Sequence, residues 1–385
     1  MTTTAASGPG PDAADDGPAL VLRGLRKSFG PAVAVDGVDL VVGRGEFVTL
    51  LGPSGSGKTT TLRMVAGFTA PTSGSIEIDG RDMTRVPPYR RDVGMVFQNY
   101  ALFPHMTAAQ NIGFPLQMRR MSRREIDRRV ADALALVKLD SFGDRYPRQL
   151  SGGQQQRIAL ARAVVFEPRL LLMDEPLGAL DRKLRESLQL EILHVSRELG
   201  ATVLYVTHDQ EEALVMSDRI AIFSNGQIEQ LGSGEDLYDR PASLFVADFI
   251  GESNILRGRF EWDPASGGWL TRGSSRWRVG PATAERAGQD LTAAALVVRP
   301  ERIRIIEAGH EIPADANGVE ATVDDVLYLG SDRKYGLTLP DGQRVAVREQ
   351  RDADSRQWES GQAVRLTWSV DDGVLVADSA AAAAG

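Results

Sequence analysis

Residues 52–59 read Gly-Pro-Ser-Gly-Ser-Gly-Lys-Thr and stand between two apolar segments of different pattern. The short stretch Glu46–Leu51 before them is typical of a buried strand, and apolar residues recur at helical spacing in Thr60–Phe68 after them. Glycines in such a strand-to-helix turn let successive backbone N–H groups point at phosphate oxygens, and the helix N-terminus adds the positive end of its dipole. We therefore predict a phosphate-binding loop, here called the P-loop.

An ordinary glycine-rich turn is the alternative, but the strand, the spacing, the lysine and the threonine occur together. Lys58 would reach the β- and γ-phosphates of a nucleotide, and the Thr59 hydroxyl would ligate Mg²⁺. The predicted nucleotide contacts in this segment are Gly52, Pro53, Ser54, Gly55, Ser56, Gly57, Lys58, Thr59 and Thr60.

Residues 170–175, Leu-Leu-Leu-Met-Asp-Glu, supply carboxylates for the same site. A hydrophobic strand that ends in Asp174 places this carboxylate at the strand's C-terminal edge, beside the P-loop, where it can hold Mg²⁺ through water. Glu175 points differently and can orient or deprotonate an attacking water. A surface acidic pair is the alternative for these two residues alone. Beside the P-loop, they indicate a nucleoside triphosphatase.

Composition excludes several other kinds of protein. The 385 residues carry a net charge of −8, which lacks the basic excess typical of nucleic-acid binders, so no nucleic-acid partner is predicted. There are no cysteines, which excludes disulfides and thiolate chemistry and fits a reducing compartment. No apolar run approaches the ~20 residues that a membrane-spanning helix needs, and the N-terminus is not a secretory signal.

Two compositional regimes meet near residues 251–254. Before them, short apolar strands alternate with helical segments, which predicts an α/β domain with a mostly parallel sheet covered on both faces. The predicted strands are Glu46–Leu51, Asp92–Phe97, Arg169–Met173, Ala201–Val206 and Arg219–Phe223. After them, an all-β domain resembling an OB or SH3 barrel is predicted, with strands at Ala294–Val298, Val319–Val326, Tyr335–Leu339 and Arg344–Val347. Residues 1–18 and 379–385 are predicted to be a disordered leader and tail.

One helix is clearly signalled. Ser122 and Glu125 form a capping-box pattern, and apolar residues follow at helical spacing from Ile126 to Val137. Arginines on its other faces could contact a membrane protein's loops or anionic lipid, or could simply form a solvated face, which we prefer.

Residues 150–157, Leu-Ser-Gly-Gly-Gln-Gln-Gln-Arg, look like the signature sequence of the ATP-binding-cassette family. The segment is a second glycine-rich helix start, able to donate N–H groups and the Ser151 hydroxyl to a phosphate. Two such cradles in one chain are explained if two copies pair head to tail, each ATP lying between one P-loop and the partner's signature. The resemblance implies that Ser151, Gly152, Gly153 and Gln154 contact the partner's ATP.

Other family elements occur in the expected order. Gln98 resembles the glutamine that joins Mg²⁺ and the attacking water to the transmembrane partner, and its alternative is a solvated loop residue. Asp181 resembles the residue of a loop that touches the opposite subunit, although alone it would be interpreted as a helix cap. His208 resembles the switch histidine that contacts the γ-phosphate. Phe29 matches the aromatic residue that stacks on adenine, with core packing as the alternative.

The resemblance covers about residues 20–250 and implies an ATPase domain at 19–250, with a helical subdomain at about 99–165. The β-rich segment 251–378 resembles the TOBE-type accessory domain of importer ATPases.

Residues 98–107 are similar to importer ATPases for polyamines, ferric iron, sulfate or sugars, in which this region lines the groove that receives a permease helix; local loop packing is the alternative. Residues 111–116 and 188–193 favour the polyamine (spermidine/putrescine) branch, with ferric iron, sulfate, phosphonate or sugar as alternatives.

The family implies ATP and Mg²⁺ as ligands and a homodimer of ATPase subunits. It also implies two transmembrane permease subunits, an extracytoplasmic solute-binding protein and a peripheral location on the cytoplasmic face of the inner membrane. Two other hypotheses stay open at this point. A soluble cassette ATPase acting on DNA or the ribosome typically needs a coiled-coil insertion or two cassettes, neither of which is evident. The C-terminal barrel could also act as a sensor of a small ligand.

Overall fold

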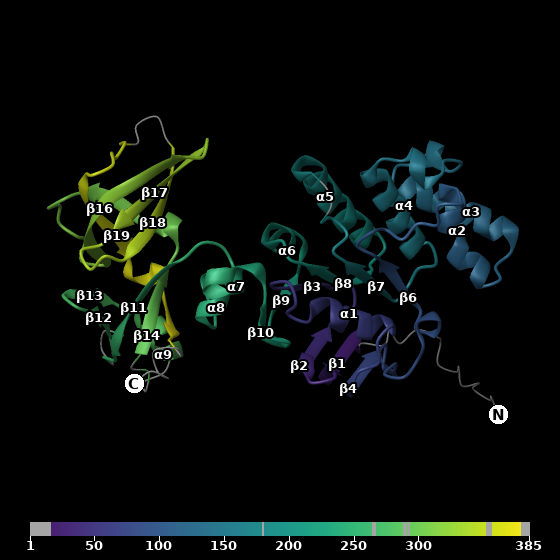
Figure 1. Ribbon diagram of the computed structural model, residues 1–385, viewed down its shortest axis with the longest axis horizontal. Coiled ribbons are helices and arrows are strands. Elements are labelled where there is room, and N and C mark those ends of the chain that lie inside the picture. Colours follow the sequence, from purple (N-terminus) through teal and green to yellow (C-terminus); the bar gives the residue numbers. More distant parts are fainter. Residues whose placement is uncertain are drawn as a thin grey trace, which may run out of the picture. The chain divides into compact units, whose positions relative to one another are not determined.

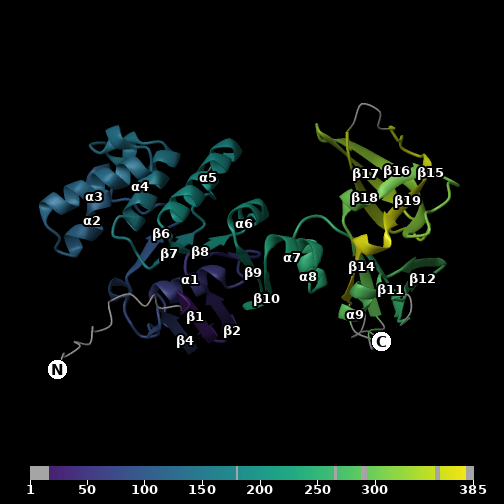
Figure 2. The same ribbon diagram turned by 180° about the vertical axis from the view of Figure 1, so that it is seen from behind.

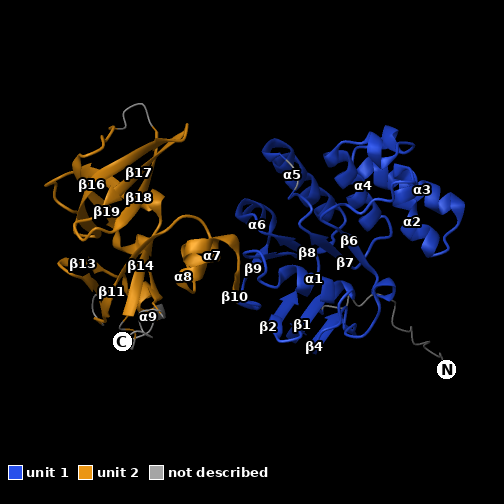
Figure 3. Cartoon of the chain, in the orientation of Figure 1, with its two compact units in different colours: residues 1–228 blue, residues 229–385 orange. Residues whose placement is uncertain are grey.

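The computed structural model describes residues 17–178, 181–263, 267–287, 291, 293–351 and 356–378. The predicted tail and all but the last two residues of the predicted leader lie outside this part of the chain. The chain divides into two compact units, residues 1–228 and 229–385 (Figure 3). None of the described helices is long and apolar enough to span a bilayer.

The first unit is built on a sheet whose parallel part runs in the order β9-β3-β8-β7-β6. Its strands are β3 (Phe47–Leu51), β6 (Val93–Val96), β7 (Leu170–Asp174), β8 (Thr202–Thr207) and β9 (Arg219–Ser224). All five predicted strands are confirmed, with ends that differ by at most one residue. The strands β3, β7 and β8 are buried along their whole length, as expected for parallel strands covered on both faces.

A second, antiparallel sheet lies in the same unit in the order β2-β1-β4-β5. Its strands are β1 (Leu20–Phe29), β2 (Ala32–Val42), β4 (Ser73–Ile78) and β5 (Arg81–Asp82). Helix α1 (Lys58–Ala66) begins directly after the P-loop and packs against β7, β8 and β2, so it contacts both sheets (Figure 1). The P-loop is thereby held at the junction of the two sheets.

Three helices gather at one end of this unit (Figures 1 and 2): α2 (Ala108–Met118), α3 (Arg123–Leu136) and α4 (Gly152–Val164). They share an apolar core that includes Ile112, Val130, Leu134 and Ile158. Two further helices, α5 (Arg182–Glu198) and α6 (Gln210–Met216), follow β7 and β8. Short 3₁₀ turns lie at Pro88–Arg90, Asp140–Phe142 and Pro147–Gln149.

The predicted capping box at α3 is half correct. Ser122 is the N-cap and its hydroxyl accepts a hydrogen bond from the Glu125 N–H at 3.3 Å. The Glu125 carboxylate does not reach back to the cap, because it binds Arg128 at 2.6 Å and Arg129 at 2.8 Å instead. Charged partners three and four residues along the helix outcompete a single backbone N–H.

A buried arginine fixes the end of α1. The Arg91 guanidinium donates to the carbonyl oxygens of Met64 and Val65, each at 2.8 Å, and to that of Val86 at 2.8 Å. Burial lowers the pKa of Arg91, as expected for a cation inside the fold. The carbonyls at the C-terminal end of the P-loop helix therefore have a charged donor.

Arg91→Ala is expected to lower the free energy of unfolding of the first unit by about 3 kcal/mol, because the carbonyl oxygens of Met64, Val65 and Val86 lose a charged donor. Urea denaturation with amide hydrogen exchange in α1 measures this change. The matched control is Arg90→Ala, since the neighbouring arginine is exposed. Equal stability of the two variants would contradict the prediction.

The second unit begins with a helical segment followed by strands. Strand β10 (Gln227–Gly232) runs across the division between the units, and α7 (Gly234–Asp239) and α8 (Leu244–Phe249) follow. The other elements are β11 (Asn254–Glu261), β12 (Trp269–Arg272), β13 (Ser275–Arg278), α9 (Pro281–Ala287), β14 (Ala293–Val298), β15 (Arg304–Glu307), β16 (Ala316–Tyr328), β17 (Asp332–Thr338), β18 (Arg344–Gln350), β19 (Ala363–Ser369) and β20 (Gly373–Ala377), with 3₁₀ turns at Pro300–Arg302 and Val370–Asp372.

These strands form two antiparallel sheets, in the orders β13-β12-β11-β14-β20 and β15-β19-β16-β17-β18. Their inner faces share one core that includes Phe260, Trp277, Tyr335 and Trp368. The prediction of a second domain built of strands is confirmed, including its four strands, and the structure adds the short helix α9 between β13 and β14. The longest of them, β16, extends beyond its predicted ends because it pairs with both β17 and β19.

Candidate functional site

The P-loop backbone passes so close to its neighbours that two positions require glycine. A Cβ at Gly52 would lie 2.3 Å from the Phe223 carbonyl oxygen, and one at Gly57 would lie 2.5 Å from that of Ala34. Gly57 also has φ 106°, which side chains rarely adopt. The turn from Pro53 to Gly55 is exposed, whereas residues 56–58 are buried. The loop is therefore fixed at its base, while its exposed turn stays open to a phosphate group.

The Lys58 ammonium lies inside this loop. Its Nζ donates to the carbonyl oxygens of Gly52 at 2.7 Å and Pro53 at 2.8 Å. Burial lowers the pKa of Lys58, and the charges of Glu175 and Asp174 act in the opposite direction. The Lys58 ammonium is thus held by two neutral carbonyl oxygens. An anionic phosphate oxygen is a stronger acceptor and can replace them.

Thr59 and Asp174 meet although 115 positions separate them in sequence. The Thr59 hydroxyl donates to Asp174 Oδ1 at 3.2 Å, across the edge where β7 ends. Burial raises the pKa of Asp174, and the hydrogen bond from Thr59 opposes this shift. A hydroxyl and a carboxylate are hard oxygen donors, so this pair fits Mg²⁺ by the chemistry of its ligands.

Two predicted residues, Gln98 and His208, converge on one oxygen atom of a third, Glu175. Gln98 Nε2 donates to Glu175 Oε2 at 3.3 Å, and His208 Nδ1 lies 3.3 Å from the same oxygen. Glu175 has φ 45° and donates its N–H to the Val206 carbonyl oxygen at 3.0 Å, which turns it away from the direction of β7. An amide and an imidazole that each lie within hydrogen-bond distance of a carboxylate can, together with it, orient a single water molecule.

Ser151 and Asp181 cap the helices that they precede. The Ser151 hydroxyl accepts from the Gln154 N–H at 3.3 Å, and the Gln154 side chain accepts from the Ser151 N–H at 2.9 Å, which completes a capping box. Asp181 Oδ1 accepts from the Leu184 N–H at 3.0 Å. Among the described residues, no hydrogen bond joins Ser151 or Asp181 to Lys58, Thr59 or Asp174. The structure therefore brings together the P-loop and carboxylate residues but leaves the signature serine apart.

Phe29 ends β1 and is 55% exposed, so it does not belong to the core. Lys27 Nζ lies 4.9 Å from the centre of its ring. An exposed ring face of this kind can stack on a flat base.

The loop after Gln98 borders an apolar groove of about 330 Å³. Its lining residues are Met95, Phe97, Ala101, Phe103, Phe114, Pro115, Arg162, Ala163 and Phe166. The buried Arg162 of α4 supports this loop: it donates to the carbonyl oxygens of Tyr100 and Ala101, both at 2.7 Å. The sequence gives no signal for this role, because the carbonyls that Arg162 contacts lie about 60 positions away.

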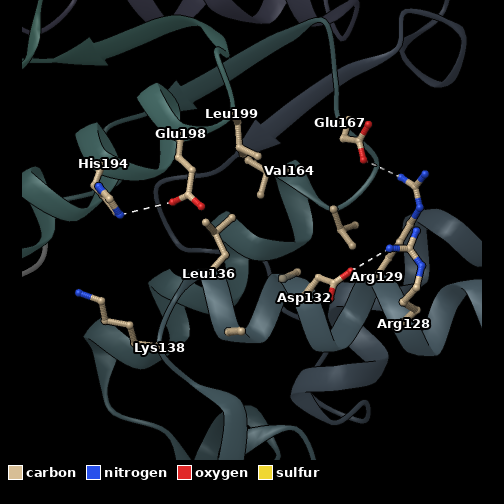
Figure 4. A pocket seen from close by; sticks show the side chains of 13 residues that line it. Arg128, Arg129, Asp132, Leu136, Lys138, Val164, Glu167, His194, Glu198 and Leu199 are labelled. Atoms are coloured by element: carbon tan, nitrogen blue, oxygen red, sulfur yellow. Dashed lines mark hydrogen bonds and ion pairs between the residues drawn. The ribbon is translucent and has the colours of Figure 1, made fainter.

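The arginines of α3 lie beside a second cavity of about 560 Å³ (Figure 4). Arg128 pairs with Asp132 at 3.1 Å, and Arg129 pairs with Glu167 at 3.1 Å. On the facing helix α5, His194 Nε2 lies 3.3 Å from Glu198. These contacts within the unit support the interpretation of the arginines as a solvated helix face.

Glu212 of α6 was not predicted as a functional residue. It is 2% exposed and lies beneath the loop that carries His208. The only sequence signal is its position three residues after Asp209, the N-cap of α6.

Comparison with known proteins decides the family. Residues 35–178 match the family described as ABC transporter. The chain is 49% identical over 352 residues to the spermidine/putrescine import ATP-binding protein PotA of Rubrobacter xylanophilus, an alignment that covers 91% of each protein. The chain belongs to the ABC transporter family. As a member of this family it is an ATPase, and its first unit is an ATP-binding domain.

Other ABC transporter proteins agree. The spermidine/putrescine import ATP-binding proteins PotA of Thermobifida fusca and of Pseudomonas aeruginosa are 46% and 47% identical, over 91% and 93% of this chain and 91% and 99% of their own. Residues 296–376 match the TOBE domain, which confirms the predicted accessory domain type. The ATP-binding cassette MJ0796, solved as a dimer bound to ADP and Pi, has 36% identity and a TM-score of 0.50, covering 56% of this chain and 98% of its own.

Proposed function

We propose that this ATPase is the energy-coupling subunit of a bacterial ABC importer whose cargo is polyamines such as spermidine and putrescine. The similarity over nine-tenths of the chain to proteins named as spermidine/putrescine import subunits carries this proposal. The order of the two matched regions, with the ABC region before the TOBE region, supports it. The cargo itself would be selected by the permease and the solute-binding protein.

In the proposed reaction, the P-loop binds the triphosphate through its backbone N–H groups, and Lys58 exchanges the carbonyls of Gly52 and Pro53 for phosphate oxygens. Thr59 and Asp174 would hold Mg²⁺, which neutralises phosphate charge when it is bound. Phe29 would stack on adenine, since its ring is exposed at the end of β1.

Glu175 then orients a water for in-line attack on the γ-phosphorus and accepts its proton. His208 and Gln98, which converge on the same Glu175 oxygen, keep this carboxylate in place. His208 would also steady the γ-phosphate. The left-handed backbone at Glu175 supports this arrangement, because it breaks the alternation of side chains along β7 and turns the Glu175 side chain toward the edge of the sheet where the P-loop lies.

A second copy of the chain would complete each site. Ser151, with the N-terminus of α4 behind it, would face the γ-phosphate held by the partner's P-loop. Asp181 would lie at the same boundary between copies. The dimeric cassette MJ0796 supports a paired arrangement.

The apolar groove beside Gln98 supports docking of a permease helix at the cytoplasmic face of the membrane. A transporter built in this way would contain two copies of this chain, two permease subunits and an extracytoplasmic solute-binding protein. When ATP closes the pair, the loop that joins Gln98 to the groove would transmit this movement to the permease.

Uptake of labelled spermidine tests this function. Cells that lack their own polyamine-import ATPase should regain ATP-dependent uptake when this chain is expressed with its permease and binding-protein partners. Uptake of sulfate, ferric iron or a sugar in the same assay, without uptake of spermidine or putrescine, would contradict the polyamine assignment.

Ala101→Glu is expected to reduce uptake by at least about tenfold while the affinity for ATP stays within about twofold, because a charge in an apolar groove opposes helix docking. Uptake and nucleotide binding are measured in parallel. Ala131→Glu, on an exposed face of α3, is the matched control and should keep parental uptake. Parental uptake by Ala101→Glu would show that the groove is not the docking site.

A further inference from the structure

A buried polar cluster lies beneath the loop that carries His208. The histidine follows β8 and is 54% exposed, while Glu212, four residues later on α6, is buried. The other members of the cluster are Tyr205 and Thr207 of β8, Asp209 at the N-cap of α6 and Arg185 of α5.

Glu212 holds the backbone on both sides of His208. Its Oε2 accepts hydrogen bonds from the Tyr205 hydroxyl and the Thr207 hydroxyl, both at 2.7 Å. The Thr207 oxygen in turn accepts from the Asp209 N–H at 3.0 Å. The residues immediately before and after His208 are therefore joined through one hydroxyl, whose orientation Glu212 fixes.

The cluster also connects this loop to α5. Arg185 Nη1 lies 2.8 Å from Asp209 Oδ2, and its Nε lies 3.8 Å from Glu212 Oε1. Asp209 Oδ1 accepts from the N–H groups of Glu211 and Glu212 at the start of α6. Because Asp181 is the N-cap of α5, one network joins the helix that Asp181 caps to the histidine that faces Glu175.

Burying the Glu212 carboxylate costs free energy, because the charged group loses its hydration. Burial raises the pKa of Glu212, although both hydroxyl donors oppose the shift, and the same environment raises the pKa of Tyr205 well above its ordinary value. An apolar side chain of similar volume would avoid this cost but would deprive the Tyr205 and Thr207 hydroxyls of their acceptor. The carboxylate supplies what an apolar group cannot, which is a fixed orientation of the Thr207 hydroxyl.

We infer that Glu212 is a positioning residue for ATP hydrolysis: it holds residues 207–209 so that His208 faces Glu175, and Arg185 links this loop to α5. The inference rests on the proposed roles of Glu175 and His208. Glu212 acts through His208 and contacts neither ATP nor the attacking water.

Steady-state phosphate release by the purified full chain provides the first test. Glu212→Ala should lower kcat about tenfold while KM for ATP stays within about twofold. Glu212→Gln, which keeps an oxygen acceptor for the two hydroxyls, should recover kcat to within about threefold of the parent. Glu211→Ala removes the same charge one residue earlier, from an exposed position, and should keep the parental kcat.

The second test combines Glu212→Ala with His208→Ala in single-turnover assays. If Glu212 acts through His208, the second substitution should lower the rate by less than about twofold in the His208→Ala background. A parental kcat for Glu212→Ala, or the same tenfold loss in both backgrounds, would overturn the inference.

Tyr205→Phe and Thr207→Ala keep the assay informative where Glu212→Ala yields no folded protein. Each removes one donor to Glu212, and each should lower kcat about threefold at an unchanged KM; parental kcat values for both would overturn the inference. A parent chain that does not hydrolyse ATP in the same assay would instead refute the proposed reaction itself.

Discussion

Glu175→Gln is expected to lower the kcat of ATP hydrolysis by about 10²–10³-fold while ATP binding stays within about threefold of the parent. The amide keeps the size of the side chain and its contacts with Gln98 and His208, but it cannot accept the proton of the attacking water. Phosphate release measures turnover, and equilibrium binding of labelled ATP measures affinity. Because the triphosphate then persists, the variant should accumulate as a closed dimer in size-exclusion chromatography.

The matched control for this variant is Glu186→Gln, on the exposed surface of α5, where Glu186 pairs with Arg182. It makes the same chemical change away from the phosphate site and should keep the parental rate. Hydrolysis by Glu175→Gln at the parental rate would remove Glu175 from the mechanism.

Ser151→Arg is expected to reduce hydrolysis at least about a hundredfold, because a long cationic side chain replaces the hydroxyl that would face the partner's triphosphate in the proposed dimer. Loss of the N-cap alone destabilises α4 by about 1 kcal/mol, which is too little to unfold the unit. The P-loop is untouched, so ATP binding to each separate chain should persist. Phosphate release and nucleotide binding distinguish these two effects.

Ser122→Arg makes the same substitution at the N-cap of α3 and provides the control for lost capping. A mixing experiment then tests the shared site directly. An equimolar mixture of Ser151→Arg and Lys58→Ala chains should recover about one quarter of the parental activity, since half of the dimers are mixed and each of these has one intact composite site. Absence of any recovery in the mixture would contradict hydrolysis at a single composite site shared by two chains.

Much of the first unit could be predicted from local pattern. Buried parallel strands are short, continuous apolar runs, so their ends were predicted to within one residue. The contact between Thr59 and Asp174 follows from the same logic, because the carboxyl ends of the parallel strands β3 and β7 lie at one edge of the sheet, with β8 between them. The resemblance to ATP-binding cassettes added Gln98 and His208, which the structure places at one Glu175 oxygen.

Contacts that depend on competition between partners were harder to predict. Glu125 fits a capping box by spacing, yet its carboxylate accepts hydrogen bonds from Arg128 and Arg129 instead of the backbone of Ser122. Ser151 and Gln154 do form a capping box, although the sequence indicated only a glycine-rich helix start with phosphate contacts, or a simple Ser-Gly-Gly cap. The cluster around Glu212 joins three elements, and no single stretch of sequence reveals that Arg185 and Tyr205 meet there.

Helix α4 has a mechanical property that follows from its two ends. It starts at Ser151 and, thirteen residues and ~20 Å later, ends beside the groove, where Arg162 grips the Tyr100–Ala101 backbone. The helix is continuous between these two ends, so a displacement at the groove would be transmitted along it to the serine. In a head-to-tail pair, force from one permease helix would therefore act first on the nucleotide gripped by the other copy.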